Sequence, residues 1–354
     1  MIVHLVGNRP QFIKLAPLFH ELETRSYEQC IIHSGQHYDA ALSDVFFQEL
    51  NIPQPYVNLK VGSGTHAEIT AGVILRMEKE LVKINPKLVV LYGDTDTTLA
   101  GALTAAKLNI PIAHVEGGLR THLKGNPEEY NRIVADHLSD ILFCPDKASL
   151  DSAEKEGMIG KAFLTGDIMY DTFLLADSGI ETVKDDIILM TWHRQENTGS
   201  KDRMESIIRF IKMLDGEIIC PMHPRTKKCL KNFGLWEDIC SIDNLEIIEP
   251  VGYLEMISLM KRARLIVTDS GGVSKESSFA GAKCLFMLEA DIWDDLVKHQ
   301  WIFKMNPEDE TSVKEALLYG RQAVRVAESE RPKFYGDGHA ATKMVDLLES
   351  KLFI

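Results

Sequence analysis

The sequence predicts an α/β protein made of two doubly wound, Rossmann-like domains that face each other across a cleft. Short apolar runs rich in β-branched residues alternate with amphipathic helical stretches along the chain, as buried parallel strands and their crossover helices do. The pattern breaks in a polar, weakly periodic stretch at 176–186 and then starts again. With 354 residues, the chain is long enough for two domains that each bury a core.

The individual strands follow from the apolar runs. In the first half, strands are predicted at 2–6, 29–33, 88–92, 111–115, 141–144 and 162–165, with amphipathic helices such as 67–83 and 97–107 between them. In the second half, they are predicted at 187–192, 217–220, 245–248, 265–268 and 284–287. Alternating strands and helices of this kind form parallel sheets with right-handed crossovers.

The domain boundaries are set by the polar stretch in the middle of the chain. We expect an N-terminal Rossmann-like domain that carries the catalytic carboxylates at 1–175, and a C-terminal, nucleotide-binding Rossmann-like domain at 176–335. The remaining residues, 336–354, contain an amphipathic stretch at 340–352. This stretch is predicted to form a helix that packs back across the junction.

Charge and cysteine usage exclude several classes of protein. The net charge of -13 argues against a general binder of nucleic acid or of anionic membranes, although a local basic pocket for a phosphorylated small molecule stays open. Six scattered cysteines lack zinc-type spacing, so we expect no metal site, free thiols and a cytoplasmic location. The first residues form a strand rather than a signal peptide, and no apolar run approaches the roughly 18 residues of a membrane span.

Three carboxylates lie in consecutive predicted strand-to-helix units and are the candidates for chemistry. Asp94 comes after the strand at 88–92, Glu116 after the strand at 111–115, and Glu128 opens the next helix. The carboxyl ends of parallel strands open on one edge of a sheet, where ligands bind. Acidic groups crowded there raise one another's pKa, which suits proton transfer. Each could instead be an ordinary helix cap or first-turn acid.

Two glycine-containing turns are candidate phosphate sites. Arg9 follows the first strand in a turn that opens a helix, where free N–H groups and a guanidinium could bind an anion. Ser270, Gly271 and Gly272 also open a helix, and paired glycines let a phosphate approach the backbone closely. Glu276, about one turn further on, could accept hydrogen bonds from ribose hydroxyls. An ordinary strand–helix turn or cap is the alternative for both.

Two histidines end adjacent strands of the second half. His193 and His223 are each followed closely by an arginine, Arg194 and Arg225, which favours contact with an anionic substrate. Tyr253 opens a later helix and could pack on a nucleotide base or in the core. An acidic first domain combined with a phosphate- and ribose-binding second domain is what a nucleotide-sugar enzyme needs.

Taken together, the motifs closely resemble the non-hydrolysing UDP-N-acetylglucosamine 2-epimerases over nearly the whole chain. They include Gly7-Asn8-Arg9-Pro10, Gly93-Asp94-Thr95, His114-Val115-Glu116-Gly117-Gly118-Leu119-Arg120, Pro127-Glu128-Glu129 with Asn131-Arg132, His193-Arg194, His223-Pro224-Arg225 and Asp269-Ser270-Gly271-Gly272. Segments such as Gly35-Gln36-His37-Tyr38-Asp39 look most like the branch that acts on UDP-diacetamido-uronic acids. The resemblance implies the glycosyltransferase-B architecture, a homodimer and no cofactor.

The resemblance also implies a mechanism of elimination and re-addition. The proton on carbon 2 of the sugar is removed as UDP leaves from carbon 1, and the resulting glycal is protonated on its other face before UDP returns. Such an enzyme would supply a precursor of a surface polysaccharide. The family roles fall on Asp94, Glu116 and Glu128 for proton transfer, His193 near carbon 1 or the diphosphate, Arg9, Ser270, Gly271 and Gly272 for phosphate, Glu276 for ribose, and Arg132, His223 and Arg225 for substrate. Which carboxylate is the base stays open.

Two departures from the family pattern bear on the substrate. Gly117 stands where the family usually has alanine. More importantly, the segment 288–295 has lost the family's Arg and Thr-Glu residues and has become acidic. A uronate would be repelled there, so we expect conversion of UDP-GlcNAc to UDP-ManNAc, with the diacetamido-uronate second. Preference for a uronate would require a replacement cation such as Arg120 or Lys124, and the whole segment could also turn away from the sugar.

Other functions remain open at this point. A hydrolysing epimerase would need the same residues and access of water to the glycal. A glycosyltransferase would need only one base and an acceptor groove, and a nucleotide-sugar sensor would bind without turnover.

Overall fold

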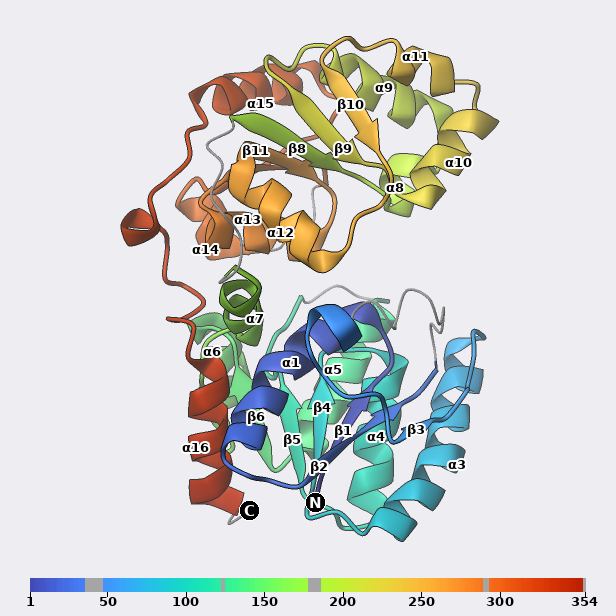
Figure 1. Cartoon of the computed structure of the whole chain (residues 1–354), viewed down its shortest axis with the longest axis vertical. Helices are drawn as coiled ribbons and strands as arrows, with labels where there is room; N and C mark the ends of the chain where they lie inside the picture. The colour runs from blue at the N-terminus through green and yellow to red at the C-terminus, as the bar shows by residue number, and fades with distance from the viewer. Residues whose placement is uncertain (36–46, 122–124, 178–185, 289–292, 353–354) are drawn as a thin grey trace. The chain divides into compact units, whose positions relative to one another are not determined.

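A computed structural model describes residues 1–35, 47–121, 125–177, 186–288 and 293–352 (Figure 1). The chain divides into two compact units. The first unit combines Met1–Leu175 with Lys333–Ile354, and the second unit is Ala176–Pro332. The first unit is therefore assembled from two separate stretches of sequence. The roles that we assign to the two halves stay predictions.

The first unit holds a parallel sheet with helices along the chain between its strands (Figure 1). In the described residues its seven strands are β1 (Ile2–Val6), β2 (Gln29–His33), β3 (Val57–Asn58), β4 (Leu88–Tyr92), β5 (Ile112–Val115), β6 (Ile141–Cys144) and β7 (Ala162–Leu164). The helices are α1 (Arg9–Thr24), α3 (His66–Ile84), α4 (Asp96–Lys107), α5 (Pro127–Leu138), α6 (Lys147–Lys155), α7 (Ile168–Asp177) and α16 (Ala340–Leu352). The strand order β3-β2-β1-β4-β5-β6-β7 reverses direction between β1 and β4.

The second unit repeats this plan. Its six described strands are β8 (Ile187–Thr191), β9 (Ile218–Pro221), β10 (Leu245–Ile248), β11 (Ala263–Thr268), β12 (Lys283–Phe286) and β13 (Ile302–Lys304). The helices are α8 (Gln195–Thr198), α9 (Lys201–Ile211), α10 (Pro224–Asn232), α11 (Trp236–Cys240), α12 (Tyr253–Arg262), α13 (Gly271–Ala280), α14 (Asp294–Lys298) and α15 (Glu310–Gln322), with a 3₁₀ turn η1 (Glu328–Glu330). The order β10-β9-β8-β11-β12-β13 reverses between β8 and β11.

These strand orders confirm the predicted fold class of two doubly wound α/β domains. Every predicted strand is present, with ends that differ by one or two residues. The strands β3 and β13 were not predicted, because two or three residues at a sheet edge leave no readable pattern. In doubly wound sheets ligands bind beyond the carboxyl ends of the strands at the reversal point. The turns after β1 and β4, and those after β8 and β11, therefore occupy the expected binding positions.

Close packing and helix caps fix these turns. In the first core, a Cβ added at Gly101 of α4 would lie 2.4 Å from Leu5 Cδ2 of β1, so the missing side chain lets helix and sheet pack closely. Side-chain oxygens of Asn8, Asn126 and Ser270 accept backbone N–H groups at the starts of α1, α5 and α13. Each of these helices therefore begins close to a candidate site residue.

The C-terminal helix α16 forms where it was predicted and packs on α1 of the first unit. Its buried residues include Met344, Val345 and Leu348. The backbone N–H of Ala341, in the first turn of α16, donates a hydrogen bond of 2.8 Å to the Asp171 carboxylate of α7. Burial raises the pKa of Asp171 to about 6. None of the helices in the described part of the chain is long and apolar enough to cross a membrane.

Candidate active site

Two of the predicted carboxylates lie at the ends of neighbouring strands, and each is paired with a cation. Asp94 follows β4 and forms an ion pair with Arg132 of α5, and Glu116 follows β5 and forms an ion pair with Lys14 of α1. A Cβ added at Gly93 would lie 3.5 Å from Glu116 Oε2, so the turn that carries Asp94 runs against the Glu116 carboxylate. The structure thus brings these two groups to one edge of the sheet.

Lys14 is a site residue that the sequence analysis gave no role. Its side chain is 8% exposed and its ammonium group contacts Glu116 Oε2. The signal in the sequence was a lysine between Ile13 and Leu15, in a stretch of α1 from residue 12 to residue 19 that is otherwise entirely apolar. A lysine in such a position is normally buried only with a partner, and the partner here lies on a distant strand end.

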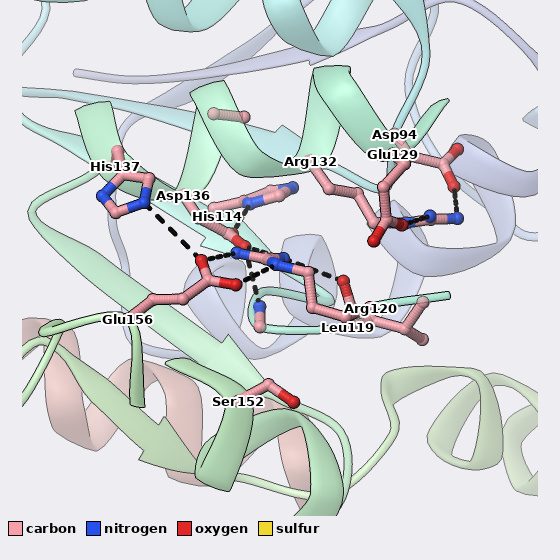
Figure 2. Close-up of polar contacts among 12 residues, drawn as sticks. Asp94, His114, Leu119, Arg120, Glu129, Arg132, Asp136, His137, Ser152 and Glu156 are labelled. Atoms are coloured by element: carbon pink, nitrogen blue, oxygen red, sulfur yellow. Dashed lines mark hydrogen bonds and ion pairs between the residues drawn. The ribbon is translucent and has the colours of Figure 1, made fainter. Parts of the chain in front are cut away.

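The third predicted carboxylate is placed differently from its neighbour in the sequence. Glu128 lies exposed in the first turn of α5, and its role stays a prediction. Glu129 is buried, accepts from Arg132 Nη1 at 2.9 Å and accepts from the hydroxyl of Thr121 at 2.9 Å. Figure 2 shows Arg132 in contact with both Glu129 and Asp94. The predicted substrate residue Arg132 is therefore engaged by two carboxylates of the protein itself.

The backbone at Glu116 is held in an unusual conformation. Its φ of 73° lies in the left-handed region, which costs a non-glycine residue about 1–3 kcal/mol. The following amides fix the turn: Gly117 N donates to Phe143 O at 3.0 Å, and Gly118 N donates to Asp136 Oδ2 at 3.0 Å. Strain of this kind persists only where the surrounding structure enforces it, and it is common at active sites.

The glycine at position 117, where the family usually has alanine, has a local explanation. A Cβ at Gly117 would lie 3.0 Å from Leu142 Cβ and 3.2 Å from Asp136 Oδ1. Both distances are tighter than ordinary contacts. The missing methyl group therefore leaves space for the buried Asp136 carboxylate beside the Glu116 turn.

Arg120 is not available as the replacement cation that a uronate would require. Its side chain is 2% exposed and donates to Asp136 Oδ2 and to both oxygens of Glu156, each at 2.7–2.8 Å (Figure 2). The expectation that Arg120 could meet a substrate carboxylate is wrong, because its guanidinium is already shared between two carboxylates. The other candidate, Lys124, lies outside the described residues.

In the second unit, the two predicted histidines come together. His193 follows β8 and His223 follows the neighbouring β9, and their rings stack with centroids 4.9 Å apart. The buried Asp269, which follows β11, accepts from the backbone N–H of His193 at 3.0 Å and of Arg194 at 2.9 Å. Asp269 had been assigned no role from the sequence, yet it ties together the two turns at the strand reversal. His223 Nδ1 accepts from the backbone N–H of Arg225, whose side chain is exposed.

The N-terminus of α13 has the features of an anion site. Ser270 caps it, accepting from Val273 N, and among the described residues no atom lies within 4 Å of a Cβ placed at Gly272. Arg194 Nη2 lies 4.0 Å from the corresponding position at Gly271, so a guanidinium stands near the same helix end. Arg9, the other predicted phosphate residue, is exposed at the start of α1 in the first unit. A helix N-terminus with open glycines and a cation suits a phosphate group.

Glu276 lies on α13 and is held by a tyrosine. The hydroxyl of Tyr253 donates to Glu276 Oε1 at 2.7 Å, and both side chains are buried. Of the two interpretations given to Tyr253, burial in the core is therefore the observed one, together with a contact to the predicted ribose residue.

The altered segment at 288–295 is only partly described, and its described end contacts α13. The indole N–H of Trp293 donates to Gly271 O at 3.0 Å, and the Lys275 ammonium lies 4.6 Å from the Trp293 ring centroid. Asp294 and Asp295 are first-turn acids of α14, the ordinary position for such residues. Glu289 and Asp291 lie outside the described residues, so the predicted repulsion of a uronate by this segment is untested.

The chain matches known sequences along nearly its whole length. The sequence model of the UDP-N-acetylglucosamine 2-epimerase family matches residues 20–349. A UDP-N-acetylglucosamine 2-epimerase homolog of Methanococcus maripaludis is 42% identical over 360 residues, which covers 99% of each chain. The UDP-2,3-diacetamido-2,3-dideoxy-D-glucuronate 2-epimerase of Pseudomonas aeruginosa is 37% identical over 359 residues, 98% of this chain and 99% of that one.

A solved structure gives the same result for the fold. The UDP-GlcNAc 2-epimerase of Methanocaldococcus jannaschii, crystallised in complex with UDP-GlcNAc and UDP, matches with a TM-score of 0.86 and 36% identity over 99% of each chain. Sequence and structure agree along almost the whole length, and the chain belongs to the UDP-N-acetylglucosamine 2-epimerase family.

Proposed function

We propose that this protein converts UDP-GlcNAc to UDP-ManNAc by inverting carbon 2 of the sugar. The observation that carries this proposal is the pair Asp94 and Glu116 at neighbouring strand ends, each held by a cation from another element. The M. jannaschii relative, solved with UDP-GlcNAc and UDP, supports the choice of nucleotide sugar. The enzyme would work in the cytoplasm, would form a homodimer as members of its family usually do, and would supply a surface polysaccharide precursor.

The reaction needs groups that move a proton and groups that stabilise the leaving diphosphate. Carbon 2 bears no carbonyl neighbour, so its proton leaves only together with departure of UDP from carbon 1, which gives a glycal. Asp94 and Glu116 would remove this proton and return one to the opposite face, with the exposed Glu128 as the third candidate. The developing charge on the diphosphate would be stabilised by His193, Arg9 and the N-terminus of α13 at Ser270, Gly271 and Gly272.

The choice between sugars rests on the cations of the first unit. A uronate, the kind of sugar for which the P. aeruginosa relative is named, would need a cation for its carboxylate. Around the described carboxylates, Lys14 contacts Glu116, Arg132 contacts Asp94, and Arg120 contacts Asp136. Since these three cations are engaged by the protein, a neutral N-acetylamino sugar is the better fit, and the diacetamido-uronate is the second candidate.

Incubation of the protein with UDP-GlcNAc in deuterated water tests the function directly. Proton NMR is expected to show UDP-ManNAc forming, with deuterium at carbon 2 of the sugar and no acceptor required. The same experiment with the UDP-diacetamido-uronate is expected to show a lower kcat/KM. A preference for the uronate of more than about tenfold, about 1.4 kcal/mol of transition-state binding, would contradict the neutral-sugar assignment.

Each of the other functions gives an outcome that differs from epimerisation in the same experiment. A hydrolysing enzyme would release free N-acetylmannosamine and UDP, and a glycosyltransferase would leave carbon 2 undeuterated. A sensor would bind UDP-GlcNAc without any exchange. Each of these results would replace the epimerase proposal.

Replacement of Glu276 by alanine tests the ribose assignment. Glu276→Ala is expected to weaken UDP binding by about tenfold or more, because hydrogen bonds to a carboxylate are worth about 1.5–3 kcal/mol. Binding of inorganic pyrophosphate, which has no ribose, is expected to stay unchanged in the same calorimetric titration. The matched control is Glu255→Ala, which removes an exposed glutamate from the first turn of α12. Equal losses for UDP and pyrophosphate would remove Glu276 from ribose binding.

A further inference from the structure

We propose that His114 is held as a doubly protonated imidazolium by the buried carboxylate of Asp136, and that this ion pair positions Asp94 and Glu116 for proton transfer. His114 and Asp136 are positioning residues in this scheme, since they would act through the turns that carry the two carboxylates. The kinetic part of the inference rests on the proposed function, and the statement about the His114 proton does not.

The protonation state follows from the atoms that face the ring. His114 is fully buried in β5, with Nδ1 2.7 Å from Asp136 Oδ1 and Nε2 2.7 Å from the backbone oxygen of Gly93. A carbonyl oxygen and an ionised carboxylate only accept hydrogen bonds. Neutral imidazole has one N–H and would leave one of these two contacts without a proton. Both ring nitrogens must therefore donate, as in the cation.

The carboxylate that faces His114 is in its ionised form. Asp136 also accepts from Gly118 N at 3.0 Å and from Arg120 Nη1 at 2.7 Å, both at Oδ2, while Oδ1 faces His114. Burial alone would raise the pKa of Asp136, but the hydrogen bonds and charges of His114 and Arg120 outweigh it and hold the pKa below its usual value. A proton on Asp136 could sit only on Oδ1, facing His114 Nδ1, and the positive charge of Arg120 beside Oδ2 disfavours that neutral form.

The charges along this buried group alternate. The imidazolium of His114, the carboxylate of Asp136, the guanidinium of Arg120 and the carboxylate of Glu156 follow one another, and the last is partly exposed (Figure 2). Every buried charge thus has an opposite neighbour with hydrogen-bond geometry, which is the condition for keeping ions inside a protein. A neutral His114 would leave Asp136 with one cation fewer.

The ion pair connects three elements of the candidate site. Through Gly93 O, His114 holds the turn that carries Asp94, and through Gly118 N, Asp136 holds the turn that carries the strained Glu116. Asp136 itself belongs to α5, the helix that also supplies Arg132 to Asp94. A single buried carboxylate therefore links both proton-transfer turns to the helix between β5 and β6, and small displacements of such groups reduce turnover strongly.

The first test is a measurement on the unmodified protein. In ¹⁵N-histidine-labelled protein at about pH 8, where an unperturbed histidine is neutral, the two ring nitrogens of His114 are expected to show the similar shifts of an imidazolium. The signal is identified by its loss in His114→Gln. A strongly separated, pyridine-type nitrogen at His114 would overturn the proposal, whether or not the enzyme turns over any sugar.

The second test is Asp136→Asn, which keeps the size of the side chain and removes its charge. The amide NH₂ can then donate to His114 Nδ1, so His114 is expected to become neutral with its proton on Nε2. We expect kcat to fall by about tenfold or more, while KM and the affinity for UDP change by less than about threefold. A general loss of structure would instead change UDP binding and turnover together.

The matched control is Asp140→Asn. Asp140 is exposed and accepts from Ile112 N at 2.9 Å, so it holds the opposite end of the same strand β5. Its amide variant is expected to keep the kcat of the unmodified protein and the imidazolium signal of His114. An unchanged kcat in Asp136→Asn, or an equal loss in both variants, would contradict the positioning role. A wild-type protein that is inert toward UDP-sugars would refute the proposed function alone, since the NMR result still decides the state of His114.

Discussion

Glu116→Gln and Asp94→Asn are each expected to lower kcat by about a hundredfold or more, the usual contribution of a group that transfers a proton. Both amides keep the shape of the carboxylate but cannot accept the proton from carbon 2. Each also loses its ion pair, with Lys14 or with Arg132. Deuterium exchange at carbon 2 is expected to fall in parallel with turnover, because both measurements report the same proton transfer.

The control for these variants is Glu80→Gln on α3. Glu80 pairs with Lys83 one turn away on the same helix. The substitution therefore removes a carboxylate–lysine contact that lies away from the strand ends of the candidate site. Its kcat is expected to be unchanged. Near-normal turnover in Glu116→Gln or in Asp94→Asn would exclude that residue from proton transfer, and the same measurement on Glu128→Gln decides whether the exposed glutamate takes part.

Gly118→Ala is expected to lower the unfolding temperature by about 5–10 °C, measured by calorimetry. The left-handed backbone of Gly118, with φ of 78°, costs a residue with a Cβ about 1–2 kcal/mol. In addition, that Cβ would lie 2.3 Å from the backbone oxygen of Ser149 in α6. A helix backbone cannot move aside as a side chain can, so overpacking adds about 1–3 kcal/mol.

A second glycine separates the two contributions. Gly157 has φ of 86° and no described atom within 4 Å of an added Cβ, so Gly157→Ala imposes the backbone strain without the collision. Its unfolding temperature is expected to fall by only about 2–4 °C. If both variants lose the same stability, the contact with Ser149 contributes nothing and the close approach of the Gly118 turn to α6 is not a constraint.

The sequence was most informative where a pattern repeats locally. The apolar strands and the helices 340–352 and 97–107 could be placed because burial imposes a period on neighbouring residues. The turns at their ends could then be assigned to one edge of each sheet, since parallel strands point the same way. This reasoning placed Asp94 beside Glu116 and His193 beside His223 before any contact was known.

The partners of these residues could not be predicted, because they depend on contacts between distant elements. Lys14 meets Glu116 only after α1 has packed near the end of β5. Glu128 and Glu129 are adjacent in sequence, yet only the second is buried, since successive residues of a helix face in different directions. The wrong prediction for Arg120 has the same cause. Its two partner carboxylates, Asp136 of α5 and Glu156 just after α6, lie far from Arg120 in the sequence, so no local pattern indicates these contacts.

The position of α16 has a consequence for how the protein is made. A ribosome synthesises all of Ala176–Pro332 before it synthesises α16. This helix packs on α1, and its first turn is hydrogen-bonded to Asp171. The second unit is continuous and can fold as soon as it has emerged. Until α16 has also been synthesised, the face of α1 on which it packs stays open to water or to chaperones. The first unit is therefore the first to be synthesised and the last to be completed.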